Sequence, residues 1–307
     1  MHRSGADNAA VRDFELPVNL ARAAAEANDT GSPRLAWLTA LPEIVGELAR
    51  RWTLDLGPPF QPGGVASWVA PATDASGAHL VLKAGWRHGE ALHEADGLLA
   101  WDGHGAVRLV DSLVVEDTSA LLLEACEPGT ALSEALPPPE QDVVVARLLR
   151  RLWIDPPPDH PFRTLHNMCG WWADEFDHKY VTAPDALRVD PGIARHGMEL
   201  FRGLPGTAAR SVLLCTDLHH GNVLAAQREP WLMIDPKPHV GDPTYDPVQH
   251  VLNFPDRLTA DPIGLADRMS LLLDLDRVRV RQWLFARCVQ ESVDQPYLHR
   301  VATALAP

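Results

Sequence analysis

The stretch CTDLHHGN (residues 215–222) decides how this chain is interpreted, and it directly follows the apolar run SVLL. Within eight residues it contains Asp217, two adjacent histidines and Asn222. Three interpretations are open at this point. The stretch is a cluster of metal ligands, a loop for phosphoryl transfer, or a polar turn in which histidine has no special role.

The spacing of Asp217 and Asn222 favours phosphoryl transfer. That chemistry needs an aspartate that orients and deprotonates the attacking hydroxyl, and an asparagine five positions later that ligates magnesium. Gly221, beside Asn222, allows the sharp turn that would bring both side chains to one side. Taken alone, the spacing is weak evidence and is more typical of a turn whose Asp and Asn satisfy nearby backbone groups.

A second aspartate, Asp235, ends the short apolar run WLMI and lies 13 residues after Asn222. A hairpin of about that length would return Asp235 to the side of Asn222. Magnesium prefers oxygen ligands, and a carboxylate with an amide oxygen supplies such a pair. The simpler alternative is an aspartate that caps the turn before Pro236.

The N-terminal half contains the residue types that would hold a nucleotide. Lys83 ends an apolar strand, where kinase-like folds place the lysine that binds phosphates. Its partner would be Glu90 or Glu94, and Glu94 fits the helical pattern better. Gly63 and Gly64 would lie in a hairpin over the phosphates. The full G-x-G-x-x-G spacing is absent, and the chain contains no Walker A sequence.

Hydrophobic periodicity predicts two lobes of different character. The first, residues 1–126, begins with a loose tail over 1–13 and is otherwise rich in strands. We expect strands at 65–72, 79–85, 107–117 and 121–125, with helices at 35–52 and 89–103. The second lobe, residues 127–307, is mainly helical, with helices at 140–153, 167–180, 192–203, 264–273 and 277–293. Short strands are expected in SVLLCTD and PWLMID. A cleft between lobes is a favoured place for a cofactor.

Composition excludes several classes of protein. The net charge of −14 makes a nucleic-acid partner improbable and suits a cationic small molecule. Four widely spaced cysteines form no CxxC pair, which argues against a structural zinc site or a disulfide scaffold. The first 25 residues lack the pattern of a signal peptide, and no apolar run approaches membrane-spanning length. We therefore expect a cytoplasmic monomer with no membrane partner.

The order of these features is that of a kinase: glycine pair, strand lysine, helix glutamate, D-x-x-x-x-N, strand aspartate. With LVLKAG, HEADGLLAWDGHGAVRLV and the block from CTDLHHGN to DPVQHVLN, the chain resembles the aminoglycoside phosphotransferase family. Within it, the resemblance is greatest to the streptomycin 6-phosphotransferase and aminoglycoside/hydroxyurea resistance kinase branch. The resemblance implies an α+β, bilobal protein-kinase-like fold, with ATP and Mg²⁺ as cofactors and an antibiotic hydroxyl as acceptor.

Carried over by position, the resemblance implies a role for each candidate. Asp217 would be the catalytic base, Asn222 and Asp235 the magnesium ligands, and Lys83 the phosphate-binding residue. The nucleotide-binding residues would be Gly63, Gly64, Lys83 and Glu94, with Leu123, Glu124, Ala125 and Cys126 as the hinge that meets adenine. Asp246 would stabilise the catalytic loop. Cys215 stands where related enzymes often have histidine, so the loop needs a different brace. Pro-Lys follows Asp235 in place of Phe-Gly.

An acceptor with two guanidinium groups, such as streptomycin, requires carboxylates. The candidate substrate residues are Asp174, Asp177, Glu291 and Asp246, with Glu175 and Asp294 as further acids nearby. A solvated helix face explains these acids equally well. Trp171 and Trp172 offer cation–π faces, but core packing is the simpler explanation for both.

Three other functions stay open. One is a kinase of hydroxyurea or of another small hydroxylated metabolite. A second is a metal-dependent hydrolase that uses Asp217, His219, His220 and His239, although adjacent histidines point to opposite sides of an extended segment. A third is a kinase-like binding module without turnover. In the kinase interpretation His219 braces the loop, and His220 faces the cleft or solvent.

Overall fold

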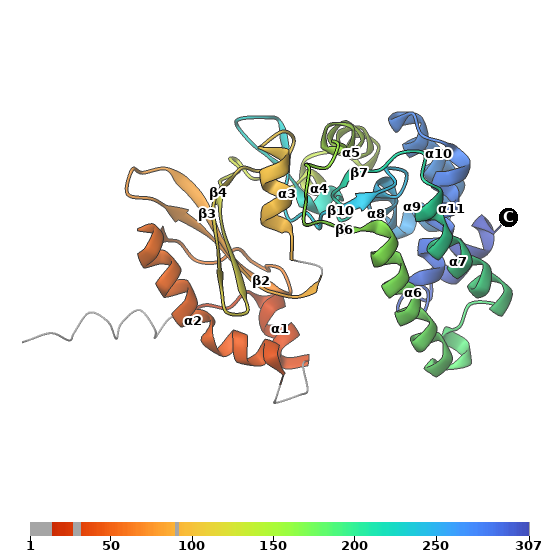
Figure 1. Ribbon diagram of the computed structural model, residues 1–307, viewed down its shortest axis with the longest axis horizontal. Helices are drawn as coiled ribbons and strands as arrows, with labels where there is room; N and C mark the ends of the chain where they lie inside the picture. Colours follow the sequence, from red (N-terminus) through yellow and green to blue (C-terminus); the bar gives the residue numbers. More distant parts are fainter. Residues whose placement is uncertain (1–13, 27–31, 90–91, 307) are drawn as a thin grey trace, which may run out of the picture. The chain divides into compact units, whose positions relative to one another are not determined.

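A computed structural model describes residues 14–26, 32–89 and 92–306 (Figure 1). The chain divides into two compact units. The first contains the described residues up to Ala95 together with Val107–Cys126, and the second contains Asp96–Ala106 and Glu127–Pro307. Within the described ranges, no helix is long and apolar enough to cross a membrane.

The first unit is built on a five-stranded antiparallel sheet with the order β1-β2-β3-β5-β4. In the central strands, Lys83 of β3 lies opposite Val69 of β2 and Leu121 of β5. Buried and half-buried residues alternate strictly along β2, as expected for a strand with one face on a core. The strands are β1 (Asp55–Leu56), β2 (Ser67–Thr73), β3 (His79–Trp86), β4 (Leu109–Val115) and β5 (Thr118–Glu124).

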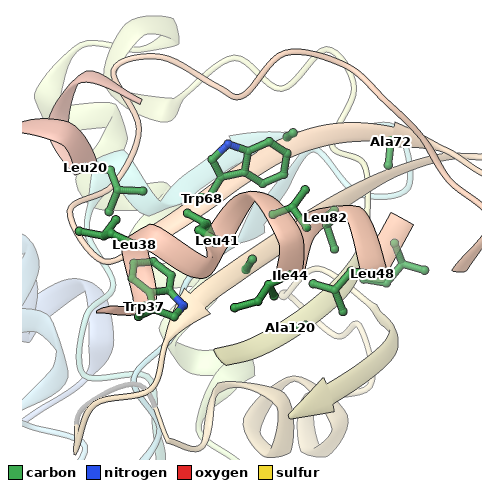
Figure 2. Packing of buried hydrophobic residues seen from close by; sticks show 14 of the residues in the cluster. Leu20, Trp37, Leu38, Leu41, Ile44, Leu48, Trp68, Ala72, Leu82 and Ala120 are labelled. Atoms are coloured by element: carbon green, nitrogen blue, oxygen red, sulfur yellow. The ribbon is translucent and has the colours of Figure 1, made fainter. Parts of the chain in front are cut away.

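The core of this unit lies between the sheet and helix α2 (Pro33–Trp52), as Figure 2 shows. Leu41 and Leu48 are fully buried and point from α2 toward the strands. Trp37 is also buried, and its Nε1 donates to Thr118 Oγ1 at 2.9 Å. A shorter helix, α1 (Val18–Glu26), adds Leu20 to the same core. Pro33 at the start of α2 has a fixed φ that suits the first turn of a helix.

The second unit is mainly helical. Its segment Asp96–Ala106 continues α3 (Glu94–Trp101), a helix that begins in the first unit. Trp101 Nε1 donates to the Leu152 carbonyl at 2.8 Å, and the Met233 amide donates to the Gly105 carbonyl at 2.9 Å. The other helices are α4 (Leu132–Ala135), α5 (Pro138–Leu152), α6 (Leu165–Thr182), α7 (Pro191–Gly203), α8 (Asp246–Leu252), α9 (Pro255–Ala260), α10 (Pro262–Leu273), α11 (Arg277–Gln290) and α12 (Leu298–Leu305).

Two small sheets complete the second unit. In the first, β10 (His239–Gly241) lies between β6 (Arg163–Thr164) and β7 (Val212–Leu214). In the other, β8 (Val223–Ala225) and β9 (Trp231–Met233) form an antiparallel hairpin in which Val223 faces Met233. These short strands frame the loop that carries Asp217.

The expected fold class, with a β-rich first part and a mainly helical second part, is confirmed. The sequence did not predict α1, α8, α9 and α12, because six to nine residues are too few to show a clear helical period. The predicted tail at 1–13 lies outside the described residues. Residues 96–106 also belong to the second compact unit, whereas we expected one boundary between the lobes, at residue 126.

Candidate active site

Asp217 and Asn222 lie in one compact turn between β7 and β8, which we call the Asp217 loop (residues 215–222). The Asp217 amide donates to the Cys215 carbonyl at 2.7 Å. The Asn222 amide donates to the His219 carbonyl at 2.9 Å, and its side-chain Nδ2 donates to the Asp217 carbonyl at 3.0 Å. The loop therefore crosses back on itself and keeps the aspartate and the asparagine together.

Asp235 is brought to the same place by the hairpin of β8 and β9. The Ile234 amide donates to the Asn222 carbonyl at 2.9 Å, so Asp235 follows directly after a residue bonded to Asn222. The sequence predicted that a hairpin would bring Asp235 back to the side of Asn222 in this way. Asp235 has a left-handed φ of 52°, and its Oδ1 accepts from Lys237 Nζ at 2.7 Å. Lys237 is a neighbour that the sequence analysis did not anticipate.

The oxygen donors of Asn222 and Asp235 fit a magnesium ion. Because the Asp217 carbonyl can only accept a hydrogen bond, the bond from Asn222 Nδ2 fixes the orientation of that amide. Asn222 Oδ1 is therefore the atom of that amide that would serve as a metal ligand. With the carboxylate of Asp235 it forms the small, hard donor set that magnesium prefers, which leaves coordination positions for phosphate oxygens and water.

Asp246 accepts hydrogen bonds from the backbone of the Asp217 loop and so stabilises it. Its carboxylate accepts from the Thr216 amide at 2.9 Å, from the Cys215 amide at 3.3 Å and from Trp153 Nε1 at 2.9 Å. These bonds hold the backbone at position 215, where a brace other than histidine was expected. Burial raises the pKa of Asp246 to about 6, although its hydrogen bonds favour the charged form. With 1% of its surface exposed, Asp246 cannot meet a substrate, and its place among the candidate substrate residues is corrected.

Burial lowers the pKa of both histidines of the loop. His219 Nδ1 accepts from the Gly221 amide at 3.0 Å, and burial lowers the pKa of His219 to about 4. His220 packs against Phe254 with ring centroids 4.5 Å apart, and burial lowers its pKa as well. Within residues 14–26, 32–89 and 92–306, no group of three or more His, Cys, Asp or Glu side chains is placed to hold a metal.

In the first unit, Lys83 of β3 and Glu94 of α3 form a buried ion pair. Lys83 Nζ lies 2.6 and 2.7 Å from the two carboxylate oxygens of Glu94. The exposed fractions of the two side chains are 9% and 6%. The pairing that the sequence favoured is formed, whereas the alternative partner, Glu90, lies outside the described residues. A buried ammonium held by a carboxylate is fixed in place, as phosphate binding requires.

The glycine pair occupies the loop between β1 and β2, over the edge of the sheet. Gly63 has a φ of +72°, and a Cβ atom there would lie 2.4 Å from the Pro17 Cβ. Its carbonyl accepts from Asn19 Nδ2 at 2.8 Å. Gly63 therefore anchors this loop to α1, whereas a Cβ at Gly64 would meet no atom of the described residues within 4 Å. Gly64 is the glycine at which a ligand can approach the backbone.

The predicted hinge, Leu123 to Cys126, begins at the end of β5. Leu123 is buried and faces Val81 of β3, and the Glu124 amide donates to the Arg108 carbonyl at 3.0 Å. Cys126 ends the first unit. The segment is thus fixed by the sheet at its start, and its contact with a nucleotide stays a prediction.

The other acids predicted to bind substrate, Asp174, Asp177 and Glu291, are paired with basic side chains. Asp174 and Asp177 both accept from Arg202 Nη2, at 2.8 and 2.7 Å. Glu291 pairs with Arg287, four residues earlier on α11. A cationic substrate would have to displace these partners, so the solvated-face interpretation suits Asp174 and Asp177 better.

Two further acids and two tryptophans were also considered as contacts for a cationic substrate. Glu175 and Asp294 both contact Lys179 Nζ, at 2.9 and 2.7 Å. Trp172 is half-buried, but 53% of Trp171 is exposed. Core packing is therefore the wrong explanation for Trp171, which presents an aromatic face to solvent.

Comparison with known proteins places these features in a family. Residues 51–295 match the family described as aminoglycoside/hydroxyurea antibiotic resistance kinase. Streptomycin 6-kinase of Streptomyces glaucescens is 34% identical over 287 residues, which cover 91% of this chain and 90% of that protein. Hydroxyurea phosphotransferase of Kitasatospora aureofaciens is 31% identical over 291 residues, which cover 85% of this chain and 74% of that protein.

A solved structure shows the same fold. An aminoglycoside phosphotransferase of Streptomyces rimosus, determined with ADP and streptomycin, matches with a TM-score of 0.52 and 16% identity. The match covers 86% of this chain and 98% of that one. The expected kinase-like fold is confirmed.

Proposed function

The chain belongs to the aminoglycoside/hydroxyurea antibiotic resistance kinase family and is a phosphotransferase acting on a hydroxyl group. On this premise we propose that it transfers the γ-phosphoryl group of ATP to the 6-hydroxyl of streptomycin, in a reaction that depends on Mg²⁺. Such a reaction adds a dianionic group to a cationic antibiotic and so confers resistance.

The observation that carries the proposal is the meeting of Asp217, Asn222 and Asp235. One loop and one hairpin hold the three residues together, in a chain that is 34% identical to a streptomycin 6-kinase. The net charge of −14 supports attraction of a cationic acceptor.

Each residue has a distinct part in the proposed mechanism. Asp217 orients the acceptor hydroxyl and accepts its proton as the oxygen attacks phosphorus. Lys83, fixed by Glu94, binds phosphate oxygens of the nucleotide. Asn222 and Asp235 are the residues that would hold magnesium, and the bound ion would neutralise charge on the phosphates. Because the transition state of phosphoryl transfer is loose, positioning and charge neutralisation provide most of the rate enhancement.

Hydroxyurea is the second candidate acceptor, because a hydroxyurea phosphotransferase is 31% identical to this chain. Hydroxyurea is small and uncharged, whereas streptomycin carries two guanidinium groups. The acidic side chains near α6 and α11 already have basic partners, so they do not by themselves separate the two acceptors.

The test is to incubate the protein with ATP and Mg²⁺ and with streptomycin, other aminoglycosides or hydroxyurea, and to measure product mass. We expect streptomycin to gain one phosphoryl group. Asp217→Asn should lower kcat by about 10²–10⁴-fold, the usual contribution of a general base. The matched control is Asp276→Asn, because Asp276 is an exposed helix cap and asparagine caps a helix equally well.

Three outcomes would contradict the proposal. Near-full activity of Asp217→Asn would remove Asp217 from the mechanism. Phosphorylation of hydroxyurea alone would change the acceptor. Nucleotide binding without turnover on any acceptor would indicate a binding module.

A further inference from the structure

Gln249 of α8 contacts the carboxylate of Asp217. Its Nε2 donates to Asp217 Oδ1 at 3.2 Å, and the side chain is half-buried. Gln249 lies 32 residues beyond Asp217, and no role was expected for it, although it falls within the block that carries the family resemblance. Its amide reaches the side chain proposed to accept the substrate proton.

The orientation of the Gln249 amide is set by Arg287 of α11. Arg287 Nη2 lies 3.4 Å from Gln249 Oε1. A guanidinium group can donate hydrogen bonds but cannot accept them, so the amide oxygen must face Arg287. The amide nitrogen must then face Asp217. Among uncharged side chains of this length, only a glutamine amide can accept from the arginine and donate to the aspartate at once.

Arg287 is itself held rigidly. It is 3% exposed, pairs with Glu291 and donates to the Tyr245 hydroxyl. Its guanidinium carbon also lies 4.7 Å from the ring centroid of Trp172, within cation–π range. Because a buried guanidinium with these contacts has little freedom to move, it is a fixed reference point for Gln249.

We propose that Gln249 is a positioning residue, and that Arg287 and Gln249 together fix the direction of the Asp217 carboxylate toward the acceptor hydroxyl. This inference rests on the proposed function of Asp217 as the base. By holding Oδ1, the Gln249 amide sets the plane of the carboxylate that receives the proton. Glu291 also has a role in this arrangement, because its carboxylate holds Arg287 in place.

Two substitutions separate positioning from packing. Gln249→Leu removes both hydrogen bonds but keeps a side chain of similar volume. Gln249→Glu keeps an acceptor for Arg287 but places a carboxylate against Asp217 in place of the donor. A role in packing alone predicts that Gln249→Leu is as active as the wild type, because the side-chain volume is retained.

We expect both variants to lower kcat by about tenfold to hundredfold, the effect of a misplaced reacting group. The KM for ATP and the thermal unfolding temperature of Gln249→Glu should stay near the wild-type values. The matched controls are Gln227→Leu and Gln227→Glu. Gln227 is an exposed glutamine of the same unit that also donates to a carboxylate, Glu127, at 3.3 Å. Both controls should keep the wild-type kcat.

A second measurement does not depend on activity. Crystal structures of the wild type and Gln249→Leu should show the Asp217 carboxylate in one side-chain conformation in the former and turned or in several conformations in the latter. An unchanged Asp217 side chain in Gln249→Leu would overturn the inference, as would wild-type kcat in Gln249→Glu. If the wild type phosphorylates no acceptor, the proposed function fails, and the crystal structures still decide the position of Asp217.

Discussion

The core beneath α2 in the first unit and the Asp217 loop in the second are stabilised in different ways. In the first, many apolar side chains of α2 pack against a sheet, and each of them removes some apolar surface from water. In the second, one buried carboxylate, Asp246, accepts the amides of Cys215 and Thr216 and the indole of Trp153. An apolar layer spreads its stabilisation over many contacts, whereas in the loop three donors share one buried acceptor.

The largest effect is expected from Asp246→Ala, which removes that group. Two buried amides and an indole N–H would lose their acceptor at once. We expect the free energy of unfolding to fall by about 3–5 kcal/mol, because each buried donor left without an acceptor costs about 1–3 kcal/mol. We also expect kcat to fall at least about hundredfold, because the loop that carries Asp217 would shift. Urea denaturation and phosphoryl-transfer assays measure the two effects.

Asp190→Ala is the matched control for this change. Asp190 also accepts two backbone amides, from Gly192 and Ile193, but at the exposed start of α7. Loss of such a helix cap costs about 1 kcal/mol and should leave kcat unchanged. Equal losses of stability in the two variants would show that burial of Asp246 has no special importance.

An intermediate effect, on stability alone, is expected from Leu41→Ala in the apolar layer. Leu41 is fully buried beneath the sheet, so its truncation leaves a cavity. We expect the free energy of unfolding to fall by about 3 kcal/mol, with kcat of the folded protein close to the wild-type value. Leu271→Ala, at a leucine that is 82% exposed, should change stability by less than about 0.5 kcal/mol. A hundredfold loss of kcat in Leu41→Ala would contradict the comparison.

The smallest effect concerns His250, a buried polar group of α8. Its Nε2 lies 3.0 Å from Asp142 Oδ1, a carboxylate that also binds Arg257 and Arg268. Burial lowers the pKa of His250 below its ordinary value of 6.5, and the positive charge of Arg257 acts in the same direction. The stability that the neutral imidazole contributes is therefore complete above pH 6.5 and is lost as the pH falls through the folded-state pKa.

His250→Gln tests this contribution, because glutamine can donate to Asp142 but does not titrate. Below pH 6.5, the unfolding free energy of the wild type should fall more steeply than that of the variant. The difference should reach at most about 1.4 kcal/mol per pH unit. Urea denaturation between about pH 5 and pH 7.5 measures both slopes. Parallel curves across that range would rule out a contribution from His250.

The difference between the core beneath α2 and the Asp217 loop also explains which features could be predicted from the sequence. Much of the first unit was predictable, because apolar residues at helical and strand spacing identify α2, β2 and β3 directly. Lys83 followed from its place on β3, and Glu94 from its place on the predicted helix at 89–103. Local spacing also predicted that the hairpin would return Asp235 to Asn222.

Several contacts of the second unit join positions far apart in the chain, and no local sequence pattern predicts them. Asp246 binds Thr216 across 30 residues, and Gln249 reaches Asp217 across 32. The resemblance assigned Asp246 to the loop, but only the structure shows which groups it binds. The basic partners of the predicted substrate acids were missed for the same reason, since Arg202 lies 25 residues from Asp177.

The segment Asp96–Ala106 has a practical consequence for dividing this enzyme into fragments. A cut after residue 126 would leave Trp101 and Gly105 on the N-terminal fragment, although both bond to residues of the second unit. The C-terminal fragment would then lack part of its own structure. A split-protein reporter, or expression of the helical part alone, would need to graft residues 96–106 onto 127–307.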